Sequence, residues 1–138
     1  MRESGIVNRE ISDVLSTLGH TDEMIVCDAG FAIPLGVRTV DISYSENKPT
    51  VPDILKELRE HLSVESLVIS EDTQKKMPQR FQELAQAFGD IPIDVVAQSE
   101  LRVRAKSVKA IIRTGDFTAF SNVLIVSGGG PRWKVERP

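Results

Sequence analysis

Apolar side chains recur along this chain with two different periods, and segments of the two kinds alternate. Residues 8–19 have the helical period, because their apolar residues lie three or four positions apart. These residues are Ile11, Val14, Leu15 and Leu18. Asn8 can cap the first turn and Gly19 can end the last one. The pattern therefore predicts a helix over 8–19.

A second helix is predicted over residues 50–62, whose apolar residues form one stripe. They are Ile54, Leu55, Leu58 and Leu62. Thr50 and Asp53 have the spacing of a capping box, and Pro52 stands near the first helical position. The remaining predicted helices cover 77–89 and 99–106.

Short apolar segments without the helical period lie between these helices, which is typical of buried strands. They cover residues 23–28, 38–43, 65–70, 93–97, 108–114 and 122–128. Strands that alternate with helices and are apolar on both faces favour a mainly parallel sheet with helices on both sides. The predicted fold class is α/β, with three layers (α/β/α). We expect a single domain over 1–138, with an irregular tail from about residue 128.

Charge and cysteine content restrict the possible partners of the 138-residue chain. A formal net charge of -3 and a pI near 5.4 argue against nucleic acid or an anionic membrane as the main partner. Cys27 is the only cysteine, so neither an intramolecular disulfide nor a cysteine-rich zinc site can form. The segment MRESGIVNRE lacks the apolar core of a signal peptide, and no apolar run approaches the ~20 residues of a membrane span. We therefore expect a cytoplasmic protein.

Three consecutive glycines, Gly128 to Gly130, follow the last predicted strand and could suggest a phosphate-binding loop. Such a loop requires the N-terminus of a helix directly after the glycines. Only PRWKVERP follows, with proline at both ends, and it cannot supply that helix. We expect the glycines to let the tail leave the sheet.

The stretch LGHTDEMIVCDAGF, residues 18–31, places a histidine and an aspartate at opposite ends of one predicted strand. Asp28 follows the strand, and in parallel α/β folds ligands bind beyond the carboxyl ends of the strands. Ser70, Gln98 and Thr114 follow other predicted strands. We expect these polar residues to lie along one edge of the sheet.

Several polar residues also have a purely structural interpretation. His20 follows a helix, where a protonated ring would interact favourably with the helix dipole. Asp28 could order its own loop by accepting hydrogen bonds from backbone amides. Glu71 and Asp72 would cap the helix that follows them. His61 stands in the last turn of a predicted helix. It is better interpreted as a solvent-exposed residue that interacts with the helix dipole than as a site residue.

Two long segments resemble the D-ribose pyranase (RbsD/FucU) family. They are GIVNREISDVLSTLGHTDEMIVCDAGFAIPLGVRTVDIS and VKAIIRTGDFTAFSNVLIVSG, and the resemblance covers almost the whole chain. Gly-His-Thr-Asp, Asp-Ala-Gly and Arg-Thr-Gly-Asp-Phe-Thr stand at the expected separations, which makes the combination specific. DAGF and TGDFT are closer to the ribose branch than to the fucose branch.

The resemblance implies an RbsD-like fold and a cytoplasmic sugar mutarotase that interconverts the ring forms of a free aldose, D-ribose or a related sugar. It implies no metal and no organic cofactor. It also implies a homo-oligomer built from rings, commonly stacked as decamers, with the active site near a subunit boundary.

The site residues follow from the same resemblance. His20 matches the acid/base, and a group that titrates near neutrality suits both proton transfers of ring opening. Asp28 matches the sugar-binding aspartate, since a carboxylate can accept two hydrogen bonds from sugar hydroxyls. Asn122 and Phe120 belong to the sugar-binding segment, where the family usually has Tyr-Ala-Asn. Gln98 stands where the family commonly has a histidine.

Two function classes follow. The first is a pyranase-type mutarotase with His20 as the acid/base. The second is a non-catalytic sugar-binding or regulatory ring protein of the same fold, because Phe120 lacks a hydroxyl and Gln98 cannot carry a proton at neutral pH. Retention of both His20 and Asp28 favours the enzyme, since a pure binder has no particular need for an imidazole.

Overall fold

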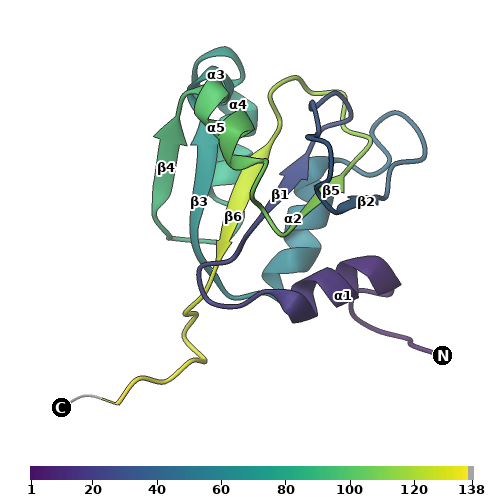
Figure 1. Cartoon of the computed structure of the whole chain (residues 1–138), viewed down its shortest axis with the longest axis vertical. Coiled ribbons are helices and arrows are strands. Elements are labelled where there is room, and N and C mark those ends of the chain that lie inside the picture. The colour runs from purple at the N-terminus through teal and green to yellow at the C-terminus, as the bar shows by residue number, and fades with distance from the viewer. Residues whose placement is uncertain (137–138) are drawn as a thin grey trace.

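The computed structural model of the chain describes residues 1–136, and within them six strands form one sheet (Figure 1). The strands are β1 (Glu23–Cys27), β2 (Thr39–Asp41), β3 (Val64–Ser70), β4 (Ile93–Val96), β5 (Ala110–Arg113) and β6 (Val123–Ser127). They are hydrogen-bonded in the order β2-β5-β1-β6-β3-β4.

The sheet is mainly parallel, as predicted. β1 and β2 are both parallel to β5, and β3 is parallel to β4. β6 is antiparallel to β1 and to β3. Of the strands in residues 1–136, β6 therefore runs against the other five. This reversal was not predicted from the sequence. Because of it, the first residue of β6 lies beside the carboxyl ends of its neighbours β1 and β3, and its last residue lies beside their amino ends.

The helices of the described residues cover both faces of the sheet. They are α1 (Arg9–Thr17), α2 (Val51–Arg59), α3 (Glu71–Lys76), α4 (Pro78–Ala85) and α5 (Gln98–Arg104). Apolar residues of α1, α2 and α4 pack with one face of the sheet. Leu101 of α5 packs with the other face, together with Ala105 and Val108 after the helix and with Phe31, Ile33 and Val37. The predicted three-layer α/β/α arrangement is confirmed.

Alternation along the strands explains why one sheet supplies two cores. In β1, Met24 and Val26 belong to the core beneath α2, whereas Ile25 and Cys27 belong to the core beneath α5. All four are fully buried. A strand that is apolar at every position can lie only between two covered faces, so continuous runs such as MIVC predict this architecture.

The helix predicted over 77–89 is α4, which begins at Pro78 as predicted and ends at Ala85, and it is preceded by a further helix, α3, that was not predicted. Ser70 caps α3, and its side chain accepts a hydrogen bond from the Thr73 amide. Glu71 and Asp72 lie inside the first turn of α3 and do not cap a later helix. α4 begins at Pro78, and the non-helical backbone of Met77 separates the two helices. A residue before proline is disfavoured in the helical conformation, which explains the break.

The segment after β6 contains no helix or strand as far as residue 136. Figure 1 shows it leaving the sheet at the end of β6. Gly128 has a φ of +152°, a value that side chains rarely allow, and its amide donates to the Ser63 carbonyl at 3.1 Å. The extent of the domain, 1–138, stays a prediction, and residues 137–138 lie outside the described part of the chain.

Candidate active site

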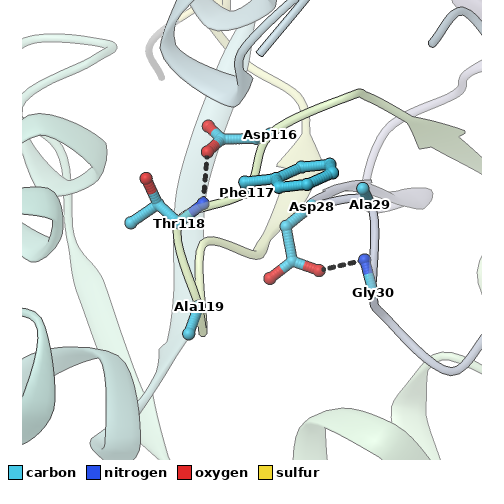
Figure 2. A pocket seen from close by; sticks show the side chains of 7 residues that line it. All are labelled: Asp28, Ala29, Gly30, Asp116, Phe117, Thr118 and Ala119. Carbon is cyan, nitrogen blue, oxygen red and sulfur yellow. Dashed lines mark hydrogen bonds between the residues drawn. The ribbon is translucent and has the colours of Figure 1, made fainter. Parts of the chain in front are cut away.

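A pocket of about 330 Å³ opens at the carboxyl ends of β1 and β5 (Figure 2). Its lining residues come from the two loops that follow these parallel strands: Asp28, Ala29, Gly30, Asp116, Phe117, Thr118 and Ala119. The Ala29 amide donates to the Asp116 carbonyl at 2.9 Å and joins the loops. The pocket therefore lies where ligands bind in folds of this kind.

Asp28 is the predicted binding residue that lines this pocket. Its side chain accepts hydrogen bonds from the backbone amides of Gly30 (Oδ1, 3.0 Å) and Ser121 (Oδ2, 3.2 Å). Asp28 is only 7% exposed, and burial raises the pKa of its carboxyl group although these amides lower it. Each oxygen retains acceptor capacity for a hydroxyl donor. The loop-ordering role and the binding role of Asp28 are therefore compatible.

Asn122 lies directly behind Asp28. Its side-chain Oδ1 accepts a hydrogen bond from the Asp28 backbone amide at 2.9 Å, and Asn122 is 3% exposed. This bond fixes the point at which the chain leaves β1. Asn122 thus positions Asp28 from behind the pocket.

Phe120 has a left-handed backbone, with a φ of +57°. Its carbonyl accepts a hydrogen bond from the Thr73 hydroxyl at 2.6 Å, which anchors this turn to α3. The Lys76 ammonium lies 4.9 Å from the centre of the Phe120 ring, within range of a cation–π interaction. A bulky residue with positive φ is uncommon, so these contacts hold an unfavourable conformation next to Ser121 and Asp28.

Asp116 is a second buried aspartate at the pocket. Its Oδ2 accepts from the Val51 amide at the start of α2 (2.9 Å) and from Nη1 of Arg80 on α4 (2.5 Å), and its Oδ1 accepts from the Thr118 amide (2.8 Å). Burial raises the pKa of Asp116, but these three groups together outweigh it and hold the pKa below its usual value. Asp116 was not predicted as a site residue. The sequence signal was its place in the RTGDFT segment after a strand.

Gln98 lies at the same edge of the sheet, as the first residue of α5 after β4. Its side-chain Oε1 is buried and has no hydrogen-bond partner among residues 1–136. A buried acceptor without a donor is unfavourable, so a donor from a ligand or another chain would stabilise this side chain.

His20 lies at the opposite edge of the sheet. It precedes β1, whereas Asp28 follows it, and the five residues of β1 span roughly 16 Å. Its imidazole is exposed, and its Nε2 lies 2.8 Å from Oε1 of Glu65 at the start of β3. The structure thus brings together Asp28, Phe120 and Asn122, places Gln98 along their edge, and leaves His20 apart from them within one chain.

Two further findings concern the described part of the chain. Among residues 1–136, no group of three or more histidine, cysteine, aspartate and glutamate side chains could hold a metal ion. None of the helices there is both long and apolar enough to cross a membrane.

The fold and the pocket define an α/β protein with two buried aspartates at the carboxyl ends of neighbouring parallel strands. The chain belongs to the RbsD / FucU transport protein family, whose profile matches residues 1–129. The resemblance deduced from the sequence motifs is therefore confirmed.

Relatives match over nearly their whole length. The chain is 41% identical over 129 residues to the D-ribose pyranase of Kosmotoga olearia, which covers 93% of this chain and 98% of that protein. It is 34% identical over 128 residues to the D-ribose pyranase of Coprothermobacter proteolyticus, with the same coverage of 93% and 98%.

Solved structures agree with this placement. Bacillus subtilis RbsD complexed with D-ribose has a TM-score of 0.89 at 30% sequence identity, and the match covers 94% of this chain and 98% of that one. The fucose mutarotase from Streptococcus pneumoniae, in complex with L-fucose, has a TM-score of 0.72 at 15% identity and covers 90% and 94%. At that identity the second structure shares the fold alone.

Proposed function

We propose that this protein is a D-ribose pyranase-type mutarotase, an isomerase that interconverts the pyranose and furanose forms of a free aldose, D-ribose in the first instance. The observation that carries the proposal is the buried Asp28 carboxylate at the pocket, fixed by backbone amides, in a chain 41% identical to a D-ribose pyranase. A fixed acceptor of this kind can orient a polyhydroxylated ring.

The protein has to supply only proton transfers for this reaction. The proton of the anomeric hydroxyl is removed, the ring oxygen gains a proton, and the bond between that oxygen and the anomeric carbon breaks to give the aldehyde. Closure through a different hydroxyl reverses these steps and produces the other ring size. His20 supplies and accepts the protons, because an imidazole can do both near neutral pH.

Asp28, Asn122 and Gln98 serve the binding of the sugar in this proposal. Asp28 accepts hydrogen bonds from sugar hydroxyls, and Asn122 keeps Asp28 in place through its backbone amide. Gln98 has a buried Oε1 that a sugar hydroxyl could satisfy. The Phe120 side chain offers a ring face, and its backbone holds the turn beside Ser121.

The active site is completed by a second copy of the chain. His20 and Asp28 occupy opposite edges of the same sheet, so one folded chain cannot bring the imidazole to its own pocket without unfolding β1. In a closed ring, each copy can present its His20 edge to the pocket edge of its neighbour. A sedimentation mass of one chain at micromolar concentration would contradict this arrangement.

Exchange NMR on D-ribose tests the function directly. Saturation of the β-pyranose anomeric signal should transfer to the furanose signals faster with protein than without it. Catalytic amounts of protein should suffice, because a true catalyst turns over. Ribose that binds without accelerated exchange, here and with other aldoses, would favour the non-catalytic sugar-binding protein instead.

A further inference from the structure

The imidazole of His20 is held from two sides. Nε2 lies 2.8 Å from Oε1 of Glu65, at the start of β3. On another side, a Cβ added to Gly128 would come within 2.3 Å of Cδ2 of His20, so the glycine backbone lies against the ring. The loop carrying His20 is tied to β6, because the Thr21 amide donates to the Ser127 carbonyl at 2.7 Å.

The other charged groups near this loop have partners of their own. Asp22 accepts hydrogen bonds from the Gly19 amide at 2.6 Å and forms an ion pair with Lys109 at 2.9 Å. Among the described residues, Glu65 is thus the acidic side chain bonded to the imidazole. A carboxylate can only accept, so the nitrogen facing it must carry the hydrogen.

From this geometry we infer that Glu65 is the positioning residue of His20, and that it fixes the ring with Nε2 protonated and Nδ1 directed to the sugar. The inference rests on the proposed function, in which His20 transfers protons. In the neutral ring, one nitrogen donates and the other accepts, and the bond made by one decides the state of the other. Nδ1 is then the atom that takes the proton of the anomeric hydroxyl.

Because the His20–Glu65 pair is exposed, it contributes to the orientation of the imidazole ring and little to the stability of the fold. The side chains of His20 and Glu65 are 67% and 45% exposed, and ion pairs in water contribute little to folding. Removal of Glu65 should therefore leave the protein folded. The chain offers a second histidine–glutamate pair for comparison. His61, which follows α2, lies 3.7 Å from Glu57 of α2, and neither was predicted as a site residue.

The test compares Glu65→Ala and Glu65→Gln with the control Glu57→Gln, using kcat and KM of D-ribose exchange together with the urea midpoint. Glu65→Ala should lower kcat about tenfold with little change in KM, a smaller loss than the ~10⁴ known for a fully buried histidine–carboxylate pair. Glu65→Gln should recover part of the rate, because its amide oxygen can still accept from Nε2. Glu57→Gln should match the parent.

Histidine-selective ¹⁵N NMR of the parent adds a readout that does not depend on activity. The neutral ring of His20 should show a protonated Nε2 and a bare Nδ1. A protonated Nδ1, an unchanged kcat in Glu65→Ala, or a loss of kcat that follows a lowered urea midpoint would each overturn the inference. If the parent fails to accelerate ribose exchange, the proposed function fails, while the spectrum still decides the orientation of the ring.

Discussion

The guanidinium of Arg80 and the carboxylate of Asp116 form a buried ion pair that holds the pocket loop to α4. Nη1 of Arg80 lies 2.5 Å from Asp116 Oδ2 and 2.6 Å from the Ser121 hydroxyl. The Asp116 side chain is fully buried, and the Arg80 side chain is 14% exposed. The Ser121 amide in turn donates to Asp28. The pair therefore supports the pocket wall through the backbone of the 116–121 turn.

Replacement of Asp116 by asparagine should strongly destabilise the fold at neutral pH. It would remove the buried counter-ion of Arg80 and leave it only the exposed Glu83, 3.7 Å from Nε, and loss of one partner of a buried ion pair typically costs about 3 kcal/mol or more. Urea unfolding at pH 7 measures the loss. The exposed Asp94 on β4 provides the control, and Asp94→Asn should change the free energy of unfolding by less than ~0.5 kcal/mol.

The effect of Asp116 should depend on pH with a definite sign. Its pKa is lower in the folded than in the unfolded protein, so the unfolded state binds more protons as the pH falls. The stability that Asp116 contributes is complete above the ordinary aspartate pKa and is lost as the pH falls through the folded value. The difference between parent and Asp116→Asn should shrink accordingly below about pH 3.9. A constant difference would argue against ionisation as its cause.

His20→Ala should abolish the accelerated exchange of ribose while preserving the fold. General acid–base groups contribute about 10²–10⁴-fold, so the loss is easily detected by exchange NMR. His61→Ala is the matched control, since the chain has only these two histidines and His61 lies after α2. Equal exchange rates in the parent and His20→Ala would show that His20 has no catalytic role and only follows the end of a helix.

Two inactive variants should restore activity when they are mixed as subunits. His20→Ala and Asp28→Ala would each be inactive alone. After co-refolding in equal amounts, sites with His20 from one copy and Asp28 from another should return about a quarter of the parental activity. Mixing folded proteins without subunit exchange serves as the control. No recovery after co-refolding would place both residues in the same chain.

Phe120→Tyr, alone or with Gln98→His, should raise the activity on D-ribose. The hydroxyl could restore a hydrogen bond worth roughly 0.5–1.5 kcal/mol, or up to about tenfold in rate if it acts in the transition state. Phe117 also lines the pocket and is exposed, so Phe117→Tyr serves as the control. It tests whether a hydroxyl added elsewhere in the pocket is enough to raise the activity. If both changes lower turnover on ribose while the parent acts on another aldose, the pocket is specific for that sugar.

Gly128→Ala should lower activity far more than Gly129→Ala. At Gly128 a Cβ would overlap the His20 ring at 2.3 Å, and the φ of +152° disfavours a side chain. At Gly129 nothing lies within 4 Å of the added Cβ. The measurement is ribose exchange with the urea midpoint as a check on folding. Similar rates in the two variants would show that the ring of His20 tolerates displacement.

Local features were predictable because neighbouring residues determine them. Thr50 and Asp53 form the predicted capping box, with the Asp53 amide bonded to Thr50 Oγ1 at 3.3 Å and the Thr50 amide to Asp53 Oδ2 at 3.0 Å. Asn8 caps α1 as predicted. The start of α4 at Pro78 was predicted for the same local reason, whereas the short helix α3 before it was missed.

The supports of the site were not predictable, because they join distant residues. Asn122 bonds to Asp28 across 94 positions, and Glu65 to His20 across 45. No periodicity relates such pairs, and Glu65 stands in a segment whose pattern indicates only a strand. Motifs could nominate Asp28, but the Arg80 that holds its neighbours comes from α4, whose pattern indicates only packing.

The reversed direction of β6 couples the two edges of the sheet. Asn122 precedes its first residue and bonds to Asp28, while Gly128 follows its last and lies against His20. The five residues of β6 thus set the distance between Asn122, which holds Asp28, and Gly128, which lies against His20. A deletion of one residue within β6 would invert the side chains on one side of the deletion between the two cores, so Asn122 and Gly128 could not both keep their places. Loops of such a protein can therefore vary in length, whereas β6 has to keep its length because the residues at both of its ends contact site residues.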